Sequence, residues 1–203
     1  MPRKVKLSPR KEPVQERSRE LRNSLLEAAT YVLKKEGPYG FTTNKVADRA
    51  GVNIASLYQY YPNKESLLFH LVEMEWSATL EAVVPILTDK EKNYRERLHC
   101  FVEKFFETEV EEFDLRKALG PAAITIEDTE EFKNLVKKAD DIYFEFFSQA
   151  LKGEPEKQIR RKTDFIRHLI TSFAVNLPKK EKEEVRDDAK TLSEMICNYF
   201  SIP

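Results

Sequence analysis

Apolar residues recur at intervals of three and four along most of the chain, the spacing that places them on one face of an α-helix. In residues 18–36 the pattern is carried by Leu21, Leu25, Ala28, Ala29 and Val32. Glycines and a proline in residues 37–40 then favour a helix stop and a turn. No stretch shows the alternating pattern typical of strands. The sequence therefore predicts an all-α protein.

Two short helices are predicted after this turn. Thr42 can cap the first, and Gly51 can supply the left-handed residue at its end. Asn53 can cap the second, at 54–60, which must stop before Pro62 because a proline disfavours helical backbone at the preceding residue. Two short helices joined by a tight glycine turn form a helix-turn-helix, whose second helix fits the major groove of DNA.

Longer helices with the same apolar spacing are predicted for the rest of the chain, which brings the total to about nine. Their expected ranges are 64 into the 80s, 94–113, 114–119, 129–151, 156–177 and a last helix through 185–200. We expect Pro85 to end or kink the first of these helices. Gly120-Pro121 is expected to follow the end of the third.

Charge divides the chain unevenly. Residues 1–66 contain 13 Lys and Arg against 7 Asp and Glu, a net charge of +6, whereas residues 67–203 contain 21 against 28, a net of −7. We therefore expect a basic disordered arm (1–17), a helix-turn-helix domain (18–63) and a larger helical domain (64–203). A basic head favours DNA, because phosphate neutralisation supplies most non-specific affinity. For the arm, a solubilising tail and a polyanion-binding segment both remain open.

Composition argues against several other classes of protein. No run of about 18 apolar residues exists and no apolar stretch follows the N-terminal charges, so neither a membrane span nor a signal peptide is expected and the predicted location is cytoplasmic. Cys100 and Cys197 fall within helical apolar patterns, which favours free thiols. Without a glycine-rich phosphate loop, a nucleophile elbow or zinc-spaced cysteines, we expect no catalytic residue, metal or cofactor.

The helix-turn-helix segment has a familiar sequence. Residues 42–47 read TTNKVA, and residues 50–65 read AGVNIASLYQYYPNKE. This run closely resembles the TetR family of bacterial transcriptional regulators, and the resemblance covers about residues 20–71. The chain departs from the family pattern at Asn53, Ala55 and Tyr61, where Ser, Gly and Phe are usual. Asn caps a helix as well as Ser does. Ala55 carries a methyl group where glycine would allow a closer approach, which puts in doubt any operator sequence borrowed from relatives, but not the fold.

The resemblance implies a set of DNA contacts. By position they are Thr42, Thr43, Asn44, Ser56, Tyr58, Gln59, Tyr60 and Lys64. Thr42, Tyr60 and Lys64 suit phosphate oxygens. Gln59 can pair with adenine through two hydrogen bonds, and Ser56 can address either type of base. For the two tyrosines, packing in the core with an exposed hydroxyl is the alternative.

For the larger helical domain the resemblance implies a ligand cavity and a dimer interface. The implied ligand is a hydrophobic or amphipathic small-molecule effector that releases the protein from DNA, with repression as the common mode. Plain core packing is the favoured alternative for each of the candidate cavity walls, which are His70, Met74, Trp76, Phe101, Phe105, Phe106, Phe113, Tyr143 and Phe147. The last two helices carry more apolar residues than one buried face needs, which favours a two-fold homodimer through Phe165, Leu169, Phe173, Leu192, Ile196 and Tyr199.

Two other functions compete with a regulator. Glu96 and His99 have the Glu-x-x-His spacing of metal-dependent helical-bundle enzymes, but that chemistry needs two such motifs, and neither His70 nor His168 has an acid three residues earlier. A protein-interaction module with an incidental basic arm is the second alternative. A salt titration distinguishes it from a DNA binder. For a DNA binder, the logarithm of the affinity falls linearly with the logarithm of the salt concentration.

Overall fold

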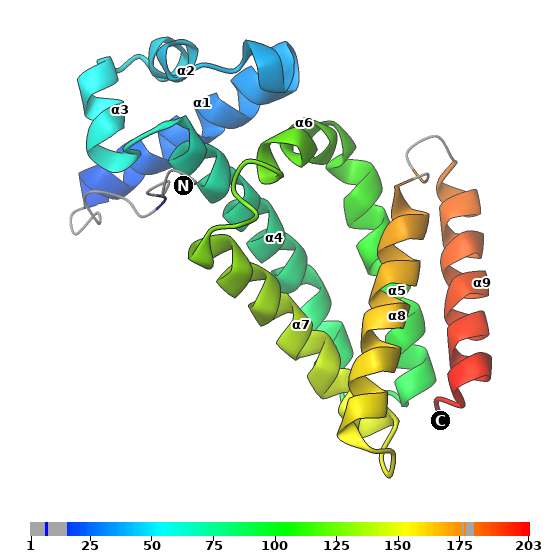
Figure 1. Ribbon diagram of the computed structural model, residues 1–203. Helices are drawn as coiled ribbons and strands as arrows, with labels where there is room; N and C mark the ends of the chain where they lie inside the picture. Colours follow the sequence, from blue (N-terminus) through cyan, green and yellow to red (C-terminus); the bar gives the residue numbers. More distant parts are fainter. Residues whose placement is uncertain (1–6, 8–15, 176, 178–180) are drawn as a thin grey trace. The chain divides into compact units, whose positions relative to one another are not determined.

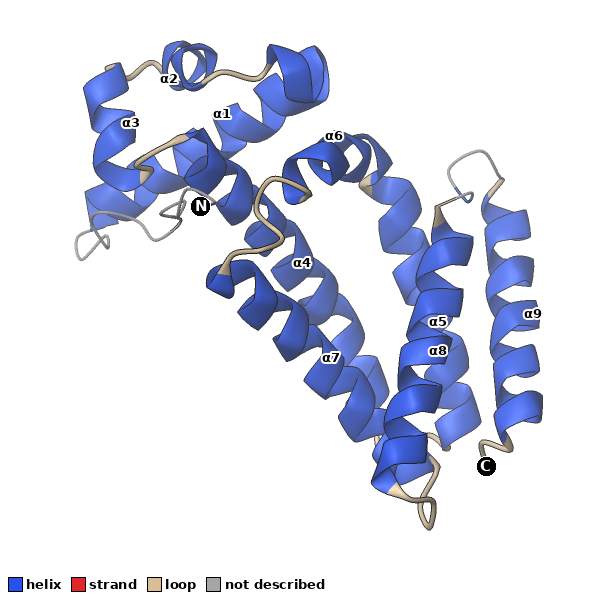
Figure 2. Cartoon of the chain, in the orientation of Figure 1, coloured by secondary structure: helices blue, strands red, loops and turns tan. Residues whose placement is uncertain are grey.

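The computed structural model describes residues 7, 16–175, 177 and 181–203 of the chain. These residues form helices joined by short loops, and no strand occurs among them (Figures 1 and 2). In chain order the helices are α1 (Glu16–Gly40), α2 (Thr43–Ala50), α3 (Ile54–Tyr60), α4 (Lys64–Thr88), α5 (Tyr94–Glu111), α6 (Phe113–Ala123), α7 (Glu130–Ala150), α8 (Glu156–Ala174) and α9 (Lys182–Phe200). The predicted all-α fold class is confirmed.

The ends of the first helices follow the predicted local chemistry. Gly37 interrupts α1 with a non-helical backbone (φ 68°, ψ 177°), so the expected break occurs there. The Thr42 side chain accepts the N–H of Lys45 at 3.3 Å and caps α2, which Gly51 ends with a left-handed conformation. The Asn53 side chain caps α3 by accepting the N–H of Ala55 at 2.8 Å. Short-range capping therefore fixes the lengths of both short helices.

Neither Pro85, where an end or a kink is expected, nor Pro121, which is expected to follow a helix, terminates its helix. Pro85 lies inside α4, which continues to Thr88, and Pro121 lies inside α6, which continues to Ala123. A proline removes one backbone hydrogen bond and crowds the preceding turn. Because each of these prolines lies in the last turn of its helix, few helical residues follow it, and the helix tolerates the loss.

The chain forms two compact units, each with its own core. The first comprises Met1–Trp76 and Asp114–Val136, and the second comprises Ser77–Phe113 and Lys137–Pro203. Fully buried side chains of the first core include Leu25, Leu33, Phe41, Leu57 and Tyr61, and those of the second include Leu98, Phe101, Phe106 and Phe147. These two units are defined by the contacts within each of them. The expected boundary between residues 63 and 64 instead separates a DNA-binding domain from a ligand-binding domain, and it stays a prediction.

Part of the expected N-terminal arm is ordered. Leu7 is fully buried in the first core, and its carbonyl oxygen accepts the hydroxyl of Ser66 at 2.6 Å. Glu16 and Arg17 already belong to α1. The expectation of disorder is therefore wrong at these three positions, and the rest of the arm lies outside the described residues. Within the described part of the chain, no helix is both long and apolar enough to cross a membrane.

Candidate nucleic-acid interface

Helix α3 has one buried side and one exposed side. Leu57 is completely buried in the first core, which holds the short helix in place. Ala55, Tyr58 and Gln59 are exposed on the same helix. Because α2 contacts both α1 and α3, the three helices form a compact headpiece with the outer face of α3 turned to solvent (Figure 1). Such a face can enter a groove of DNA without disturbing the core.

The predicted DNA contacts differ in their exposure. Thr42, Asn44, Tyr58 and Gln59 are exposed, whereas Thr43, Ser56 and Lys64 are half-buried. Tyr60 is only 5% exposed and is part of the first core. Its burial supports the alternative interpretation, in which this tyrosine packs beneath the helix.

Tyr58 is connected to α2 by a hydrogen bond that the sequence analysis did not anticipate. The hydroxyl groups of Thr43 and Tyr58 lie 3.0 Å apart. Thr43 is the first residue of α2, so this contact joins the two helices on their exposed side. The bond restrains the Tyr58 ring, and it occupies a Thr43 hydroxyl that the sequence analysis assigned to DNA.

Lys64 is the first residue of α4, and its side chain contacts the last turn of α1. Its ammonium group donates to the carbonyl oxygen of Pro38 at 3.4 Å and lies 5.6 Å from the centre of the Phe41 ring. Asn63 caps the helix by accepting the N–H of Ser66 at 2.7 Å. These contacts hold a positive charge beside the N-terminus of a helix, where an anion is favoured.

Two further cations of α2 are exposed and engaged within the headpiece. The ammonium group of Lys45 pairs with Glu36 at 3.0 Å and also donates to the carbonyl oxygen of Gly40 at 3.1 Å. The guanidinium group of Arg49 lies 4.2 Å from the centre of the Tyr31 ring. Both side chains therefore cover the surface of α1.

The departure from the family pattern at Tyr61 is accommodated inside the headpiece. The ring is fully buried, and its hydroxyl accepts a hydrogen bond from the guanidinium Nε of Arg22 at 3.4 Å. Burial raises the pKa of Tyr61, and the bond from Arg22 opposes part of that rise. The additional hydroxyl therefore has a partner, as a buried polar group requires.

The candidate effector residues divide between the two units. His70 and Trp76 pack in or against the first core, while Met74 is exposed. The imidazole Nδ1 of His70 lies 3.0 Å from Glu73 Oε2, and the ring of Trp76 lies 5.9 Å from that of Phe132.

The remaining candidates belong to the second unit, where α5 and α7 bring most of them together. Ring centres lie 6.1 Å apart for Phe101 and Phe105, and 5.6 Å apart for Phe101 and Tyr143. Phe106 stacks on Phe173 at 5.7 Å, and Phe147 is buried in the same core. Phe113, the first residue of α6, is half-buried. The nine candidate residues therefore belong to two separate compact units, each with its own core.

The six predicted dimer residues also differ in exposure. Phe165 and Tyr199 are 59% and 81% exposed, and Leu169 and Phe173 are half-buried. Leu192 and Ile196 are buried in the core of their own chain. Met195, which the set of six omits, is 60% exposed and lies four residues before Tyr199, on the same side of α9.

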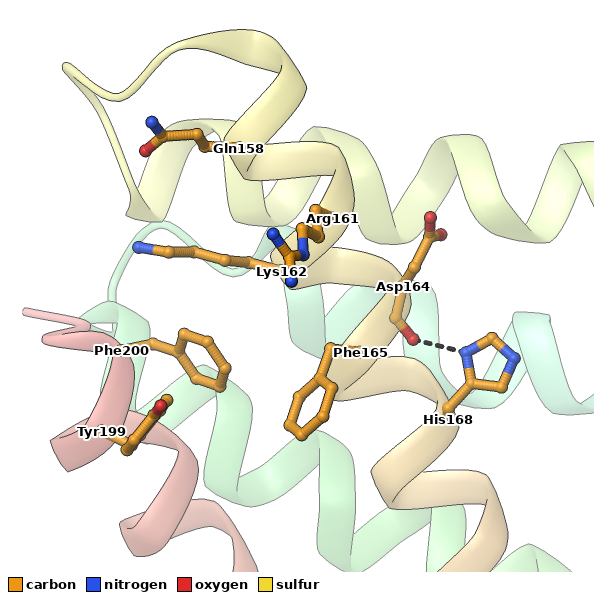
Figure 3. A pocket seen from close by; sticks show the side chains of 8 residues that line it. All are labelled: Gln158, Arg161, Lys162, Asp164, Phe165, His168, Tyr199 and Phe200. Carbon is orange, nitrogen blue, oxygen red and sulfur yellow. Dashed lines mark hydrogen bonds between the residues drawn. The ribbon is translucent and has the colours of Figure 1, made fainter.

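A groove of about 820 Å³ lies between α8 and α9 on the second unit (Figure 3). The rings of Phe165 and Phe200 meet edge to face, with their centres 6.2 Å apart, and Tyr199 lies beside Phe200 at 4.9 Å. Its full lining is Gln158, Arg161, Lys162, Asp164, Phe165, His168, Tyr199 and Phe200. The groove is therefore lined by aromatic and charged side chains together, and it includes none of the nine candidate effector residues.

The Glu-x-x-His pair has structural contacts in the second unit. The Glu96 carboxylate accepts the N–H of Asn93 at 2.9 Å, while the Asn93 side chain accepts the N–H of Glu96, so that the two residues cap α5. The imidazole of His99 lies 3.2 Å from the hydroxyl of Ser193 on α9. Among the described residues, no group of three His, Cys, Asp or Glu side chains is arranged to hold a metal ion.

Comparison with known proteins extends this picture. Residues 25–71 match the model of the family described as bacterial regulatory proteins, tetR family. The nucleoid occlusion factor SlmA of Idiomarina loihiensis is 31% identical over 88 residues, which are 43% of this chain and 44% of that protein. SlmA of Vibrio vulnificus is 32% identical over 83 residues, 40% of this chain and 42% of that protein. The chain thus spans less than half the length of these curated relatives.

Solved structures resemble the chain over most of its length. A TetR-like transcriptional regulator from Rhodococcus sp. RHA1 has a TM-score of 0.65 at 20% identity, covering 90% of this chain and 97% of that one. The regulator FadR of Bacillus subtilis, solved in complex with stearoyl-CoA, has a TM-score of 0.66 at 16% identity, covering 86% and 97%. At these identities the likeness shows the fold. Residues 25–71 therefore match the TetR family of bacterial regulatory proteins, and the chain as a whole shares the fold of these solved regulators.

Proposed function

We propose that this protein is a transcriptional regulator that binds duplex DNA through the outer face of α3. The observation that carries the proposal is the pairing of a fully buried Leu57 with exposed Tyr58 and Gln59 on one short, doubly capped helix. The basic charge of residues 1–66 supplies the attraction to phosphate.

We divide the contacts by their chemistry. Thr42 and Lys64 address phosphate oxygens and fix the register of the headpiece, whereas Gln59 and Ser56 address base edges in the major groove. Tyr58 contributes its hydroxyl, which the bond to Thr43 holds on the exposed side of the headpiece. We leave Tyr60 out of the contact set because it is buried.

The regulator acts as a two-fold homodimer on a palindromic operator. Phe165, Met195 and Tyr199 are exposed apolar side chains of α8 and α9, and a second copy would remove them from water. In such a dimer the two recognition helices are separated by one turn of DNA, about 34–36 Å. The two-fold symmetry of the dimer therefore predicts two operator half-sites at that spacing.

The output we propose is repression that a hydrophobic or amphipathic small molecule relieves. The aromatic side chains of α5 and α7 form a buried apolar core into which such a molecule would insert, and FadR of Bacillus subtilis, a protein of similar fold, was solved with stearoyl-CoA. The effector lowers DNA affinity only by its differential affinity for the two states of the protein. A regulator of bacterial genes works in the cytoplasm.

The test combines selection with salt titration. The protein is incubated with random duplexes at moderate salt, and bound DNA is amplified and sequenced; a palindrome should be enriched. On that palindrome, log affinity should fall linearly with log salt, and Lys64→Ala should reduce the slope by about one. Lys90→Ala removes an exposed lysine of the second unit and should leave the slope unchanged. Failure to enrich any sequence, together with a flat salt response, would contradict the proposal.

A further inference from the structure

Tyr39 lies in the last turn of α1, after the break at Gly37, and its side chain is almost entirely exposed to water. Its side chain is 97% exposed, the highest value among the large hydrophobic side chains of the described residues. A single exposed aromatic residue needs no explanation by itself. Tyr39 is distinguished by the backbone that carries it and by the charges on either side.

The backbone of the turn formed by residues 37–41 is restrained by a proline and a hydrogen bond. Pro38 restricts its own φ, and the N–H of Phe41 donates to the carbonyl oxygen of Gly37 at 3.1 Å. The Phe41 ring is buried in the first core. Tyr39 is therefore presented to solvent on a fixed backbone, so that a partner would bind it at little cost in backbone entropy.

Two lysines donate hydrogen bonds to backbone carbonyl oxygens on either side of Tyr39. Lys64 donates to the carbonyl oxygen of Pro38, the residue before Tyr39, and Lys45 donates to that of Gly40, the residue after it. An ammonium group has three N–H donors, so each lysine retains at least one for another acceptor. Tyr39 therefore lies between the contacts of Lys64 and of Lys45, which also pairs with Glu36, and three residues before Thr42.

We propose that Tyr39 is a further DNA contact, whose phenolic hydroxyl donates a hydrogen bond to a phosphate oxygen of the backbone that Thr42 and Lys64 also address. This inference rests on the DNA binding proposed above. A phosphate contact carries no sequence information, and a neutral hydroxyl releases no counterion. Tyr39 therefore contributes affinity equally on all sequences and leaves the salt slope unaltered.

The test measures fluorescence anisotropy on a labelled duplex from the enriched pool and on a scrambled duplex. Tyr39→Phe removes only the hydroxyl and should weaken binding to both duplexes by about 5- to 10-fold, the value of one hydrogen bond. The salt slope should stay at the wild-type value, in contrast to Lys64→Ala. Tyr31→Phe is the matched control, because Tyr31 is a partly exposed tyrosine of the same headpiece whose ring faces Arg49.

The outcomes separate this inference from the function on which it rests. If the wild type binds DNA and both Tyr39→Phe and Tyr39→Ala bind equally well, the inference is overturned while the proposed function stands. A loss confined to one duplex would indicate base reading, and a loss with Tyr39→Ala alone would indicate ring packing; either result overturns the hydroxyl contact. If the wild type binds no duplex, both proposals fail. A side chain this exposed should leave the urea unfolding curve unchanged.

Discussion

Gly37, at the break in α1, and Gly51, at the end of α2, both have a positive φ, and substituting them should have unequal effects on stability. Gly51 (φ 67°, ψ 30°) is in the left-handed helical region, whereas Gly37 (φ 68°, ψ 177°) is in a region that essentially only glycine occupies. A Cβ added at either position would meet no atom within 4 Å. The cost of alanine therefore arises from backbone conformation alone, and the two positions form a matched pair.

The magnitudes follow from the two backbone regions. For Gly51→Ala, the left-handed conformation costs roughly 1–2 kcal/mol, and a stiffer unfolded chain offsets about 0.4–1 kcal/mol, which leaves a net loss of about 1 kcal/mol. For Gly37→Ala we expect a net loss of about 2–3 kcal/mol. Asparagine tolerates the left-handed region, so Gly51→Asn should recover most of the stability, whereas Gly37→Asn should recover little.

The single tryptophan provides the assay. Trp76 belongs to the same compact unit as both glycines, so its fluorescence during urea titration follows the unfolding of that unit. The unfolding midpoint should fall further for Gly37→Ala than for Gly51→Ala, with similar slopes. Equal shifts at the two positions, or equal recovery by asparagine, would refute the backbone argument. A loss above about 4 kcal/mol at either position would point to a clash that these contacts do not contain.

Three further predictions concern one hydrogen-bonded pair and two ionisable groups whose pKa is raised by burial. Thr43→Val and Tyr58→Phe each remove one hydroxyl of the 3.0 Å pair, so their effects on DNA affinity should be less than additive in a double-mutant cycle, and strict additivity would contradict the coupling. Burial raises the pKa of Asp140, so the wild type loses stability as pH rises through that pKa. By circular dichroism in urea, Asp140→Asn should therefore become more stable relative to the wild type as pH rises from about 4, and the opposite trend would contradict the prediction. Burial also raises the pKa of the Cys197 thiol, which should react with thiol reagents far more slowly in the native protein than in urea; equal rates would show that the site is open.

Local chemistry made the headpiece predictable. Thr42, Gly51 and Asn53 act through hydrogen bonds and backbone conformations within a few residues of themselves, so the sequence alone indicated the bounds of α2 and α3. The exposed face of α3 followed from Leu57, because one buried position on a short helix determines which side faces outward.

Contacts between distant residues were not predictable in the same way. The Thr43–Tyr58 pair and the reach of Lys64 to Pro38 join residues 15 and 26 positions apart, and no spacing rule in the sequence indicates them. On α9 the apolar period includes both Ile196 and Tyr199, yet one is buried and the other exposed. Periodicity identifies apolar residues, but on a helix with apolar residues on several sides it does not identify which side the chain itself covers.

If the outer face of α3 reads bases, replacing one of its side chains should change the DNA sequence that the protein selects. Wild type and Gln59→Ala are each used to select duplexes from the same random library. We expect both to enrich a palindrome, and we expect the variant to lose preference at one base pair of each half-site, by about 1–3 kcal/mol of discrimination. Identical preferences for the two proteins, or no enriched palindrome for either, would contradict base reading by this face.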